Sequence, residues 1–427
     1  MKLLSIISLT CIHFISFAQD TLTLNRVDAE AIFIKNNLTL LAEKLQIAQA
    51  QAEVIQAKLW PNPTFEISEI NLWATENQTG GATVSPPFGN NNFGRNQQVA
   101  LELAQVIYTA GKRKKLIAIE QVGVHQQEQY FQDVIRNLKW ELRTQLTSLQ
   151  HLQQNQAIYQ TQINAIQKLI NAYQNQLDKG NIAKSEFVRL RAQSLTLTKA
   201  LSDISIEILA AQKELKMLLG VHPDTYLKID AANFVRATNT YKQLQFLNLL
   251  HLAKENRPDI KIALLENELQ ERTYQYELAQ RTPDITLSMN YDRNGNTMLN
   301  FIGFGMSMDL PFFNRNQGNI RKAKIGIEAA QIKSELAQLT VENEIALAQK
   351  NLQTVIQFAD NIDAQYEQTL DELLTVYTKN FTARNVSLLE YLDFLDTYIE
   401  NKRIMIDAQK DINDKIEALN YCIGTDL

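Results

Sequence analysis

Residues 301–323 read FIGFGMSMDLPFFNRNQGNIRKA, and this stretch decides the fold. Its first half alternates between apolar residues and small or polar ones, as a strand with one apolar face does. Pro311 ends the pattern, and a corner that contains Asn314 and Gly318 follows it. The region 327–423 holds no glycine and no proline, so the sequence predicts a short strand joined to a long stretch of helix.

Alternation of the same kind predicts four strands in all, near 64–73, 96–108, 284–293 and 301–313. The first changes phase after Ile67, which indicates a bulge. Each strand is about ten residues long, the length that a tilted strand needs to cross a bilayer. The alternation alone fits a small soluble sheet with one buried face equally well. Aromatic residues near the strand ends favour the membrane: Trp73, Tyr108, Tyr291, Phe312 and Phe313.

The first residues of the chain favour export. Residues 1–19 contain one lysine, an apolar run and a small residue near the end, which predicts a signal peptide. Cys11 allows a second interpretation, a lipoprotein acylation site, although the residues after it are apolar. No later stretch of about 18 residues is continuously apolar, so no transmembrane helix is expected. Any crossing of a membrane would therefore be made by strands.

The sequence also repeats itself. Pro63 before the first strand is matched by Pro283 before the third, and Tyr173 is matched by Tyr377. A Gly/Asn/Pro-rich stretch at 77–96 predicts a long loop in the first copy. Each copy has the order helix, strand, loop, strand, helix, turn, helix, with the turns near 180 and 384. The predicted organisation is a first repeat at 20–220, a linker at 221–245 and a second repeat at 246–427.

Apolar residues in the predicted helices recur at steps of three and four. This spacing indicates helices that pack side by side at shallow angles. The other helix faces are rich in Gln, Asn and Thr, as suits a water-filled interior. The apolar positions are Ile163, Ile166, Ile170, Tyr173, Leu177, Leu197, Leu201, Ile204, Ile208, Ala211, Leu215 and Leu218 in the first half, and Leu370, Leu374, Tyr377 and Phe381 in the second.

Four strands cannot close on themselves. In lipid, each unpaired backbone group at an open edge costs several kcal/mol. Single-chain membrane barrels begin at about eight strands. If the strands cross a membrane, their edges must pair with further copies of the chain, so the sequence predicts a ring-shaped homo-oligomer.

Three segments resemble the TolC-type outer-membrane factors, the exit ducts of bacterial tripartite efflux and type I secretion systems. They are Trp60-Pro61-Asn62-Pro63, Gln105-Val106-Ile107 with Gly111-Lys112-Arg113, and the run from Leu310 to Gly318. The last two look most like the heavy-metal, CzcC-like branch. The resemblance implies a mainly α fold with a small β part: a trimeric α/β barrel with twelve membrane strands and a tube of long antiparallel periplasmic helices. It also implies an outer-membrane location, a periplasmic adaptor (membrane fusion protein) and an inner-membrane pump of the RND type.

The closed end of such a duct should lie at the helical turns 177–189 and 381–396. Glu390, Asp393 and Asp396, with Glu400 beyond them, are the candidate gate, because a ring of carboxylates from several copies favours cations. Arg189 and Arg191 are candidate ion-pair partners for these acids. The alternative is a solvated helix face.

The same turns are the candidate docking sites for the adaptor. Arg384 stands where Gly180 stands in the first turn, which leaves the conformation of the second turn open. The residues concerned are Gly180, Asn181, Ser185, Arg384, Asn385 and Ser387.

The strand-to-helix corners are the remaining candidate sites. The run 112–115, Lys-Arg-Lys-Lys, would either meet lipid head groups or form a solvated helix start. The corner residues are Gly111, Lys112, Arg113, Pro311, Asn314 and Gly318.

The sequence offers no enzymatic constellation. His125, His151, His222 and His251 share no ligand spacing, and no phosphate loop or nucleophile elbow is present. Cys422 is the single cysteine after residue 19, which argues against a disulfide and a cysteine-based metal site. The formal net charge of −5 argues against nucleic-acid binding. We therefore expect a passive efflux duct for metal ions or other substrates, without cofactor or bound metal. The alternatives are a duct for type I protein secretion and an exported helical scaffold without a pore.

Overall fold

The computed structural model describes residues 21–71, 98–230, 234, 238–293, 300–363 and 365–427. The predicted signal peptide, Cys11, Trp73 and the loop at 77–96 lie outside these ranges. The described chain divides into two compact units. The strand-bearing unit comprises Glu43–Asp133 and Pro258–Thr340, and the helical unit comprises the described residues of Met1–Ala42, Val134–Arg257 and Val341–Leu427.

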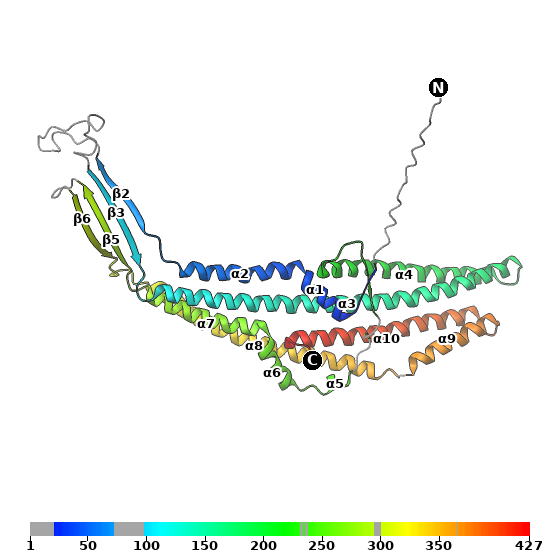
Figure 1. Ribbon diagram of the computed structural model, residues 1–427. Helices are drawn as coiled ribbons and strands as arrows, with labels where there is room; N and C mark the ends of the chain where they lie inside the picture. Colours follow the sequence, from blue (N-terminus) through cyan, green and yellow to red (C-terminus); the bar gives the residue numbers. More distant parts are fainter. Residues whose placement is uncertain (1–20, 72–97, 231–233, 235–237, 294–299, 364) are drawn as a thin grey trace, which may run out of the picture. The chain divides into compact units, whose positions relative to one another are not determined.

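A four-stranded antiparallel sheet is the centre of the strand-bearing unit. Its strands are β2 (Thr64–Asn71), β3 (Gln98–Ile107), β5 (Ile285–Arg293) and β6 (Asn300–Met308), in the order β2-β3-β5-β6 (Figure 1). Helices α2 (Leu38–Lys58) and α7 (Pro258–Ala279) precede the two hairpins, and α3 (Lys112–Asp178) and α8 (Gln317–Asp360) follow them. Each hairpin is thus continuous in sequence with helix at both ends.

The sheet register separates the two faces cleanly. One row of paired residues is entirely apolar, with Phe65, Leu103, Met289 and Phe304 on successive strands. The next row carries Glu66, Glu102, Asn290 and Gly303. The period of two that was read from the sequence therefore becomes one apolar and one polar face.

The structure confirms one prediction about the strands and corrects another. The bulge expected in the first strand is present, because the register shifts between Ser68 and Asn71 and Glu69 has φ +52°. The prediction that the last strand continues to 313 was wrong, since β6 ends at Met308. Pro311 lacks a backbone donor and cannot continue a ladder.

Gly303 and Gly305 on β6 lie beneath side chains of the neighbouring strand. A Cβ at Gly303 would come within 2.5 Å of Asn290 Oδ1, and one at Gly305 within 2.6 Å of Ser288 Oγ. Both positions must therefore stay without a side chain if Asn290 and Ser288 are to keep their places.

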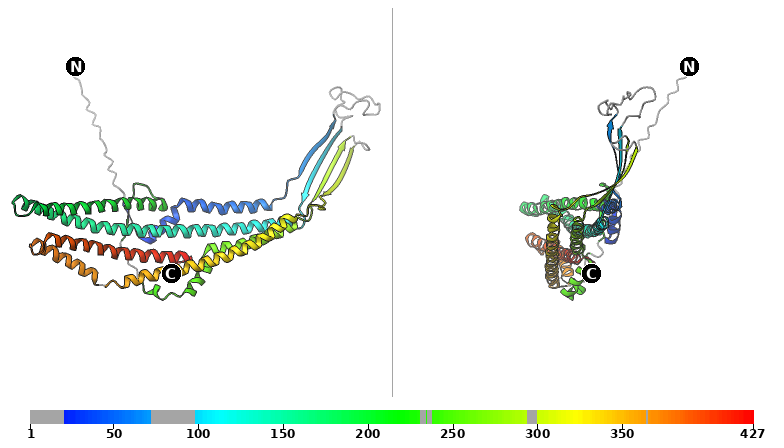
Figure 2. Two further views of the ribbon diagram at one scale, coloured as in Figure 1. Left: turned by 180° about the vertical axis from the view of Figure 1, so that it is seen from behind. Right: turned by 90° about the vertical axis from the view of Figure 1, so that its left-hand side faces the viewer.

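The helical unit is built mainly from the rest of α3 and α8 with α4 (Lys184–Leu219), α9 (Tyr366–Thr382) and α10 (Leu388–Ile423). Figure 2 shows α3 beside α4 and α9 beside α10. The smaller elements are α1 (Arg26–Asn36), α5 (Asn239–Lys242), α6 (Phe246–Asn256) and a parallel pair of short strands, β1 (Thr21–Leu24) with β4 (Tyr226–Ile229). The sequence reading missed this pair, because four residues are too few for a reliable period.

The core of the helical unit confirms the predicted steps of three and four. Ile166 and Ile170 from α3, Leu197 from α4, and Leu370 and Phe381 from α9 are buried in one cluster with residues of α10. The apolar seams of the two hairpins therefore pack on each other, as the spacing indicated.

The absence of glycine and proline after 327 does not produce one continuous helix. Helix α8 ends at Asp360 and α9 begins at Tyr366. Between them, Asp363 accepts a hydrogen bond from Gln365 N through its carboxylate and one from Tyr366 N through its carbonyl, both at 2.9 Å. An aspartate that competes for backbone donors in this way interrupts a helix without a glycine or proline.

Candidate functional site

The two helical turns have the same backbone conformation. Gly180 in the first has φ +71°, and Arg384 in the second has φ +63°. In both, the left-handed residue donates to a carbonyl of the preceding helix, from Gly180 N to Leu177 O at 2.8 Å and from Arg384 N to Phe381 O at 3.0 Å. The sequence left the conformation of the second turn open. The structure shows that Arg384 adopts the left-handed conformation that glycine adopts in the first turn.

The helices that follow the turns begin differently. In the second turn, Ser387 Oγ accepts from Glu390 N at 3.3 Å, and Glu390 Oε2 accepts from Ser387 N at 2.9 Å. The bond that Ser387 N donates to the Glu390 carboxylate, together with one from Ser387 Oγ at 2.7 Å, lowers the pKa of Glu390. In the first turn Ala183 holds the cap position without a side-chain bond, and Ser185 lies in the first turn of α4. The Glu390 carboxylate is thus committed to a capping box.

The other candidate gate acids lie on the exposed side of α10. Asp393, Asp396 and Glu400 are exposed. Asp396 Oδ1 accepts from Gln193 Nε2 of α4 at 2.6 Å. Burial raises the pKa of Asp396, the bond from Gln193 lowers it, and Asp393 raises it, with a raised pKa as the result. Gln193 is a partner that the sequence reading missed.

Arg189 and Arg191 are the predicted ion-pair partners of the gate acids. Within one chain, and among the described residues, neither arginine forms an ion pair with them. The Arg191 guanidinium lies 5.8 Å from the centre of the Phe187 ring on its own helix. A bond between these arginines and the acids would have to be made across copies of the chain.

Stacked aromatic rings connect the ends of the hairpins. Phe381 of α9 stacks on Tyr173 of α3, with 5.6 Å between ring centres, and on Tyr391 of α10, with 4.6 Å. Tyr377 stacks on Phe394 at 4.2 Å. A displacement of α9 therefore has to disturb α3 and α10 together.

A buried lysine holds α9 against α10. Lys402 is 8% exposed, and its Nζ lies 2.8 Å from Glu367 and 3.0 Å from Asp371. Tyr398 donates to the same Asp371 at 2.8 Å. The sequence could have indicated this buried lysine, because Lys402 follows Tyr398 by one helical turn in an otherwise apolar seam.

The first strand-to-helix corner is closed by side chains from both hairpins. Lys112 Nζ lies 2.8 Å from Asp284 Oδ1, which also accepts from Thr109 N at 2.9 Å. Arg113 lies over the Trp60 ring at 4.4 Å. Lys112 is buried, so neither interpretation of the basic run, lipid contact or solvation, holds for it. Asp284, which the sequence reading did not single out, is the centre of this corner.

The second corner depends on asparagine. Asn316 has φ +58°, and its side chain donates to Glu277 O at 2.9 Å. Asn314 Oδ1 accepts from Asn316 N at 3.0 Å. The left-handed position of the corner that follows Pro311 thus belongs to Asn316, while Gly318, one of the predicted corner residues, lies at the start of α8.

A charged cluster ties three segments of the helical unit together. Arg143 of α3 is 6% exposed, and its Nε lies 2.7 Å from Glu30 of α1 and its Nη1 3.0 Å from Glu417 of α10. Arg143 Nη2 also donates to Asp426 Oδ2 at 2.8 Å. Arg26 reaches Glu417 at 2.6 Å. The hydrogen bond from Arg143 is the main reason why the pKa of Asp426 lies below its ordinary value.

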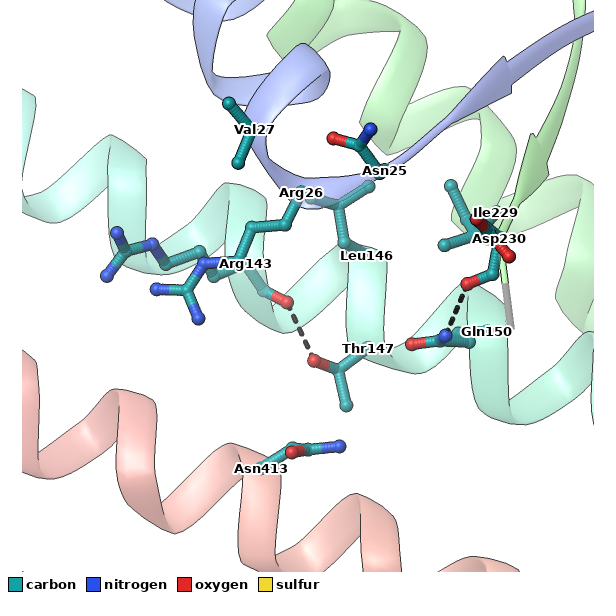
Figure 3. Close-up of a pocket in the computed structure, with 10 residues that line it drawn as sticks. All are labelled: Asn25, Arg26, Val27, Arg143, Leu146, Thr147, Gln150, Ile229, Asp230 and Asn413. Carbon is teal, nitrogen blue, oxygen red and sulfur yellow. Dashed lines mark hydrogen bonds between the residues drawn. The ribbon is translucent and has the colours of Figure 1, made fainter. Parts of the chain in front are cut away.

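A pocket of about 210 Å³ adjoins this cluster. Figure 3 shows Thr147 and Gln150 of α3 and Asn413 of α10 among its lining residues. Asn413 is buried and donates to Phe234 O at 2.7 Å, while its Oδ1 has no partner among the described residues. Such a polar pocket has the size and the acceptor for ordered water.

Across the described ranges, no group of three or more His, Cys, Asp or Glu residues could hold a metal ion. The helices in those ranges include none long and apolar enough to cross a membrane.

Comparison with known proteins matches most of the chain to one family. The model of the family described as outer membrane efflux protein matches residues 32–221 and 249–425. The structure of CusC has 17% identity and a TM-score of 0.70, covering 94% of this chain and 92% of that one. The Campylobacter jejuni CmeC outer membrane channel has 15% identity and a TM-score of 0.71, covering 93% and 85%. At these identities the likeness shows the fold.

One curated relative matches part of the chain. The cobalt-zinc-cadmium resistance protein CzcC of Cupriavidus metallidurans is 23% identical over 145 residues, which is 34% of this chain. The matched region spans 35% of the length of that relative.

Proposed function

Because the chain belongs to the outer membrane efflux protein family, we propose that it forms a passive channel across a bacterial outer membrane. The observation that carries the proposal is the four-stranded sheet with one exposed apolar face, continuous with helix at each corner. We assign the chain no catalytic step, so the work of transport comes from a partner.

The apolar face of the sheet is the surface that lipid would cover. Phe304 is 83% exposed on this face, Met306 65% and Phe65 63%. In water, a contiguous apolar face of this kind would make a monomer prone to aggregation. In a bilayer the same side chains lie in their preferred solvent.

The two edges of the sheet support an oligomer. Within the described residues, β2 and β6 each pair on one side only. Their open edges would leave backbone groups unpaired in lipid. A homotrimer, in which β6 of one copy pairs with β2 of the next, would satisfy these groups in a closed ring.

Divalent metal cations are the substrate class that we favour. CzcC is by name a cobalt-zinc-cadmium resistance protein. On the polar face, Glu66 and Glu102 lie directly opposite each other. Like charges in this position destabilise a sheet, so their presence is consistent with a channel that carries cations.

The helical turns are the proposed contact with a periplasmic adaptor, which would join the channel to an RND-type pump in the inner membrane. Gly180, Asn181, Ser185, Arg384, Asn385 and Ser387 form the docking surface in this proposal. Asp393, with Asp396 and Glu390 beside it, lines the gate.

The proposal is tested with purified protein in planar lipid bilayers and by cross-linking in detergent. We expect a trimer on denaturing gels and steps of cation-selective conductance. A monomer that stays in solution without detergent and gives no conductance would overturn it. Deletion of the gene should sensitise the bacterium to cobalt, zinc or cadmium more than to dyes and antibiotics, and equal sensitivity would remove the metal assignment alone.

A further inference from the structure

A second pocket, of about 500 Å³, lies beside the second strand-to-helix corner, inside the strand-bearing unit. Its lining combines two arginines with apolar side chains and contains no carboxylate. The residues that matter are Arg281, Arg315, Leu278, Leu310 and Phe312.

The apolar part of this pocket lies just after the end of the sheet. Leu310 and Phe312 follow the last residue of β6, Met308, by two and four positions. Leu310 is 64% exposed and Phe312 66%. The pocket therefore lies where the surface proposed to face lipid ends and helix begins.

The two arginines have guanidinium groups available to an anion. Arg315 Nε donates to Pro311 O at 3.2 Å, which orients the side chain and leaves both Nη groups free of that bond. In the part of the chain that the structure describes, no carboxylate pairs with Arg281 or Arg315. Two acids near Arg281 in sequence are engaged elsewhere: Asp284 pairs with Lys112, and Glu277 accepts from Asn316. Asp309, beside Leu310, lines the adjoining cavity and not this pocket.

We propose that this pocket binds the phosphate of an anionic glycerophospholipid, with an acyl chain along Leu310 and Phe312. Guanidinium groups match phosphate oxygens in charge and in geometry. Free phosphate could satisfy the arginines but not the apolar wall, which is why a lipid is the ligand. The inference rests on the proposed membrane location, since only there do these side chains meet lipid.

The test measures lipid bound to the full-length protein in detergent by native mass spectrometry. Dioleoyl phosphatidylglycerol is titrated against the wild type and the Arg281→Gln/Arg315→Gln variant, with dioleoyl phosphatidylcholine as the neutral lipid. We expect the wild type to prefer phosphatidylglycerol and the variant to bind it about tenfold more weakly, the effect of losing a hydrogen bond from a charged group. Arg293→Gln, which changes an exposed arginine at the other end of β5, should bind as the wild type does.

Three results would overturn the lipid site: equal binding of the two lipids by the wild type, full binding by the double variant, or displacement of phosphatidylglycerol by millimolar inorganic phosphate. Conductance and cross-linking are measured on the same preparation, so that failure of the lipid site can be distinguished from failure of the channel proposal. A trimer that conducts without lipid preference contradicts the lipid site alone, whereas a soluble monomer contradicts the channel. If the double variant does not fold, Arg315→Gln and Arg315→Lys are compared, and the lysine variant should retain more binding.

Discussion

Arg384 holds a left-handed conformation that disfavours every residue with a Cβ, by about 1 kcal/mol or more. Its counterpart in the first turn is Gly180, which adopts the same conformation at little steric cost. An arginine at such a position costs stability, and this fits a role for its charge in docking.

Replacement of Arg384 by glycine should therefore stabilise the helical unit. We expect a gain of about 0.5–1 kcal/mol, since relief of the left-handed strain is partly offset by the greater freedom of glycine in the unfolded chain. Thermal unfolding in detergent measures it. Arg189→Gly is the matched control, because it puts glycine into the first turns of α4 and should lower stability. A lower unfolding temperature for Arg384→Gly would contradict the strain argument.

Asp426 should make the stability of the folded protein depend on pH, and the sign of this dependence can be derived. Its pKa in the folded protein lies below the ordinary value of 3.8, chiefly because Arg143 donates to it. A group with a lowered folded pKa adds stability above its ordinary pKa and loses that stability as the pH falls through the folded value. Asp426→Asn should therefore be less stable than the wild type at pH 7, and the difference should shrink below about pH 4. Unfolding temperatures at pH 7, 5 and 3 measure this, and a difference that stays constant or widens would refute it. The side chain is half exposed, so the effect is small.

At the scale of single residues, the sequence predicted where the candidate residues lie along the chain but not which side chains they contact. It placed Glu390, Asp393 and Asp396 in the turn region 381–396, and in the structure they lie on the first turns of α10. It did not identify Gln193 as the partner of Asp396, or the capping role of Glu390. Such contacts depend on how α4 packs against α10, and a period of 3.6 residues in one helix carries no information about its neighbour's side chains.

At the scale of elements, the corner at Asp284 joins two hairpins that are distant in sequence. Asp284→Asn keeps the shape of the side chain but removes the charge that Lys112 needs. Because Lys112 is buried, we expect a loss of about 2 kcal/mol, less than for a fully buried pair since Asp284 is partly exposed. Thermal unfolding of the detergent-solubilised protein measures the loss. Asp309→Asn, at an exposed aspartate after β6, is the control and should leave stability nearly unchanged.

Helix α9 is the second element whose attachment can be tested. Lys402→Met keeps the packing of the stem and removes the ion pairs with Glu367 and Asp371. Both carboxylates are half exposed or more and can be solvated, so global stability should fall by no more than about 1 kcal/mol. Amide hydrogens in Tyr366–Thr382 should nevertheless exchange faster, because this short helix loses its main polar attachment. Lys410→Met, which removes a pair within α10, should leave exchange in α9 as it was; equal acceleration in both variants would argue against the attachment.

Elements with a long and regular pattern could be predicted well. The seam of residues such as Ile166, Ile170 and Leu197 is buried as the spacing required. The break after Asp360 could not be foreseen from the absence of glycine and proline, because the interruption comes from one aspartate competing for backbone donors. The short strands β1 and β4 are stabilised by their pairing with each other, which a local pattern does not reveal.

At the scale of the whole molecule, the proposed gate predicts a change in conductance. Asp393→Ser removes an exposed carboxylate without touching the capping box, whereas Glu390→Ser would also remove the bond from Ser387 N that forms half of that box. We expect Asp393→Ser channels to show a larger single-channel conductance and weaker selectivity for cations, since each copy in the ring loses one charge. Planar-bilayer recordings measure both, with Asp411→Ser farther along α10 as the control. Unchanged conductance and selectivity would remove Asp393 from the gate.

The homo-oligomer that we propose follows from a physical constraint and not from a motif. Four strands with open edges demand partners in lipid, whichever side chains they carry. The sequence could not predict the sites that depend on the folded corner, such as the pocket between Arg281 and Arg315, because these residues are separated by both strands of the second hairpin.

The glycines of β6 have a consequence for what such a channel can transmit. Because Gly303 and Gly305 have no side chains, Asn290 Oδ1 and Ser288 Oγ occupy the space that a Cβ would take on β6. A methyl group at either position would displace the neighbouring amide or hydroxyl from its present place on the polar face. If the polar face lines the proposed channel, a larger residue at either glycine would reduce the clearance for a hydrated solute once in each copy of the ring.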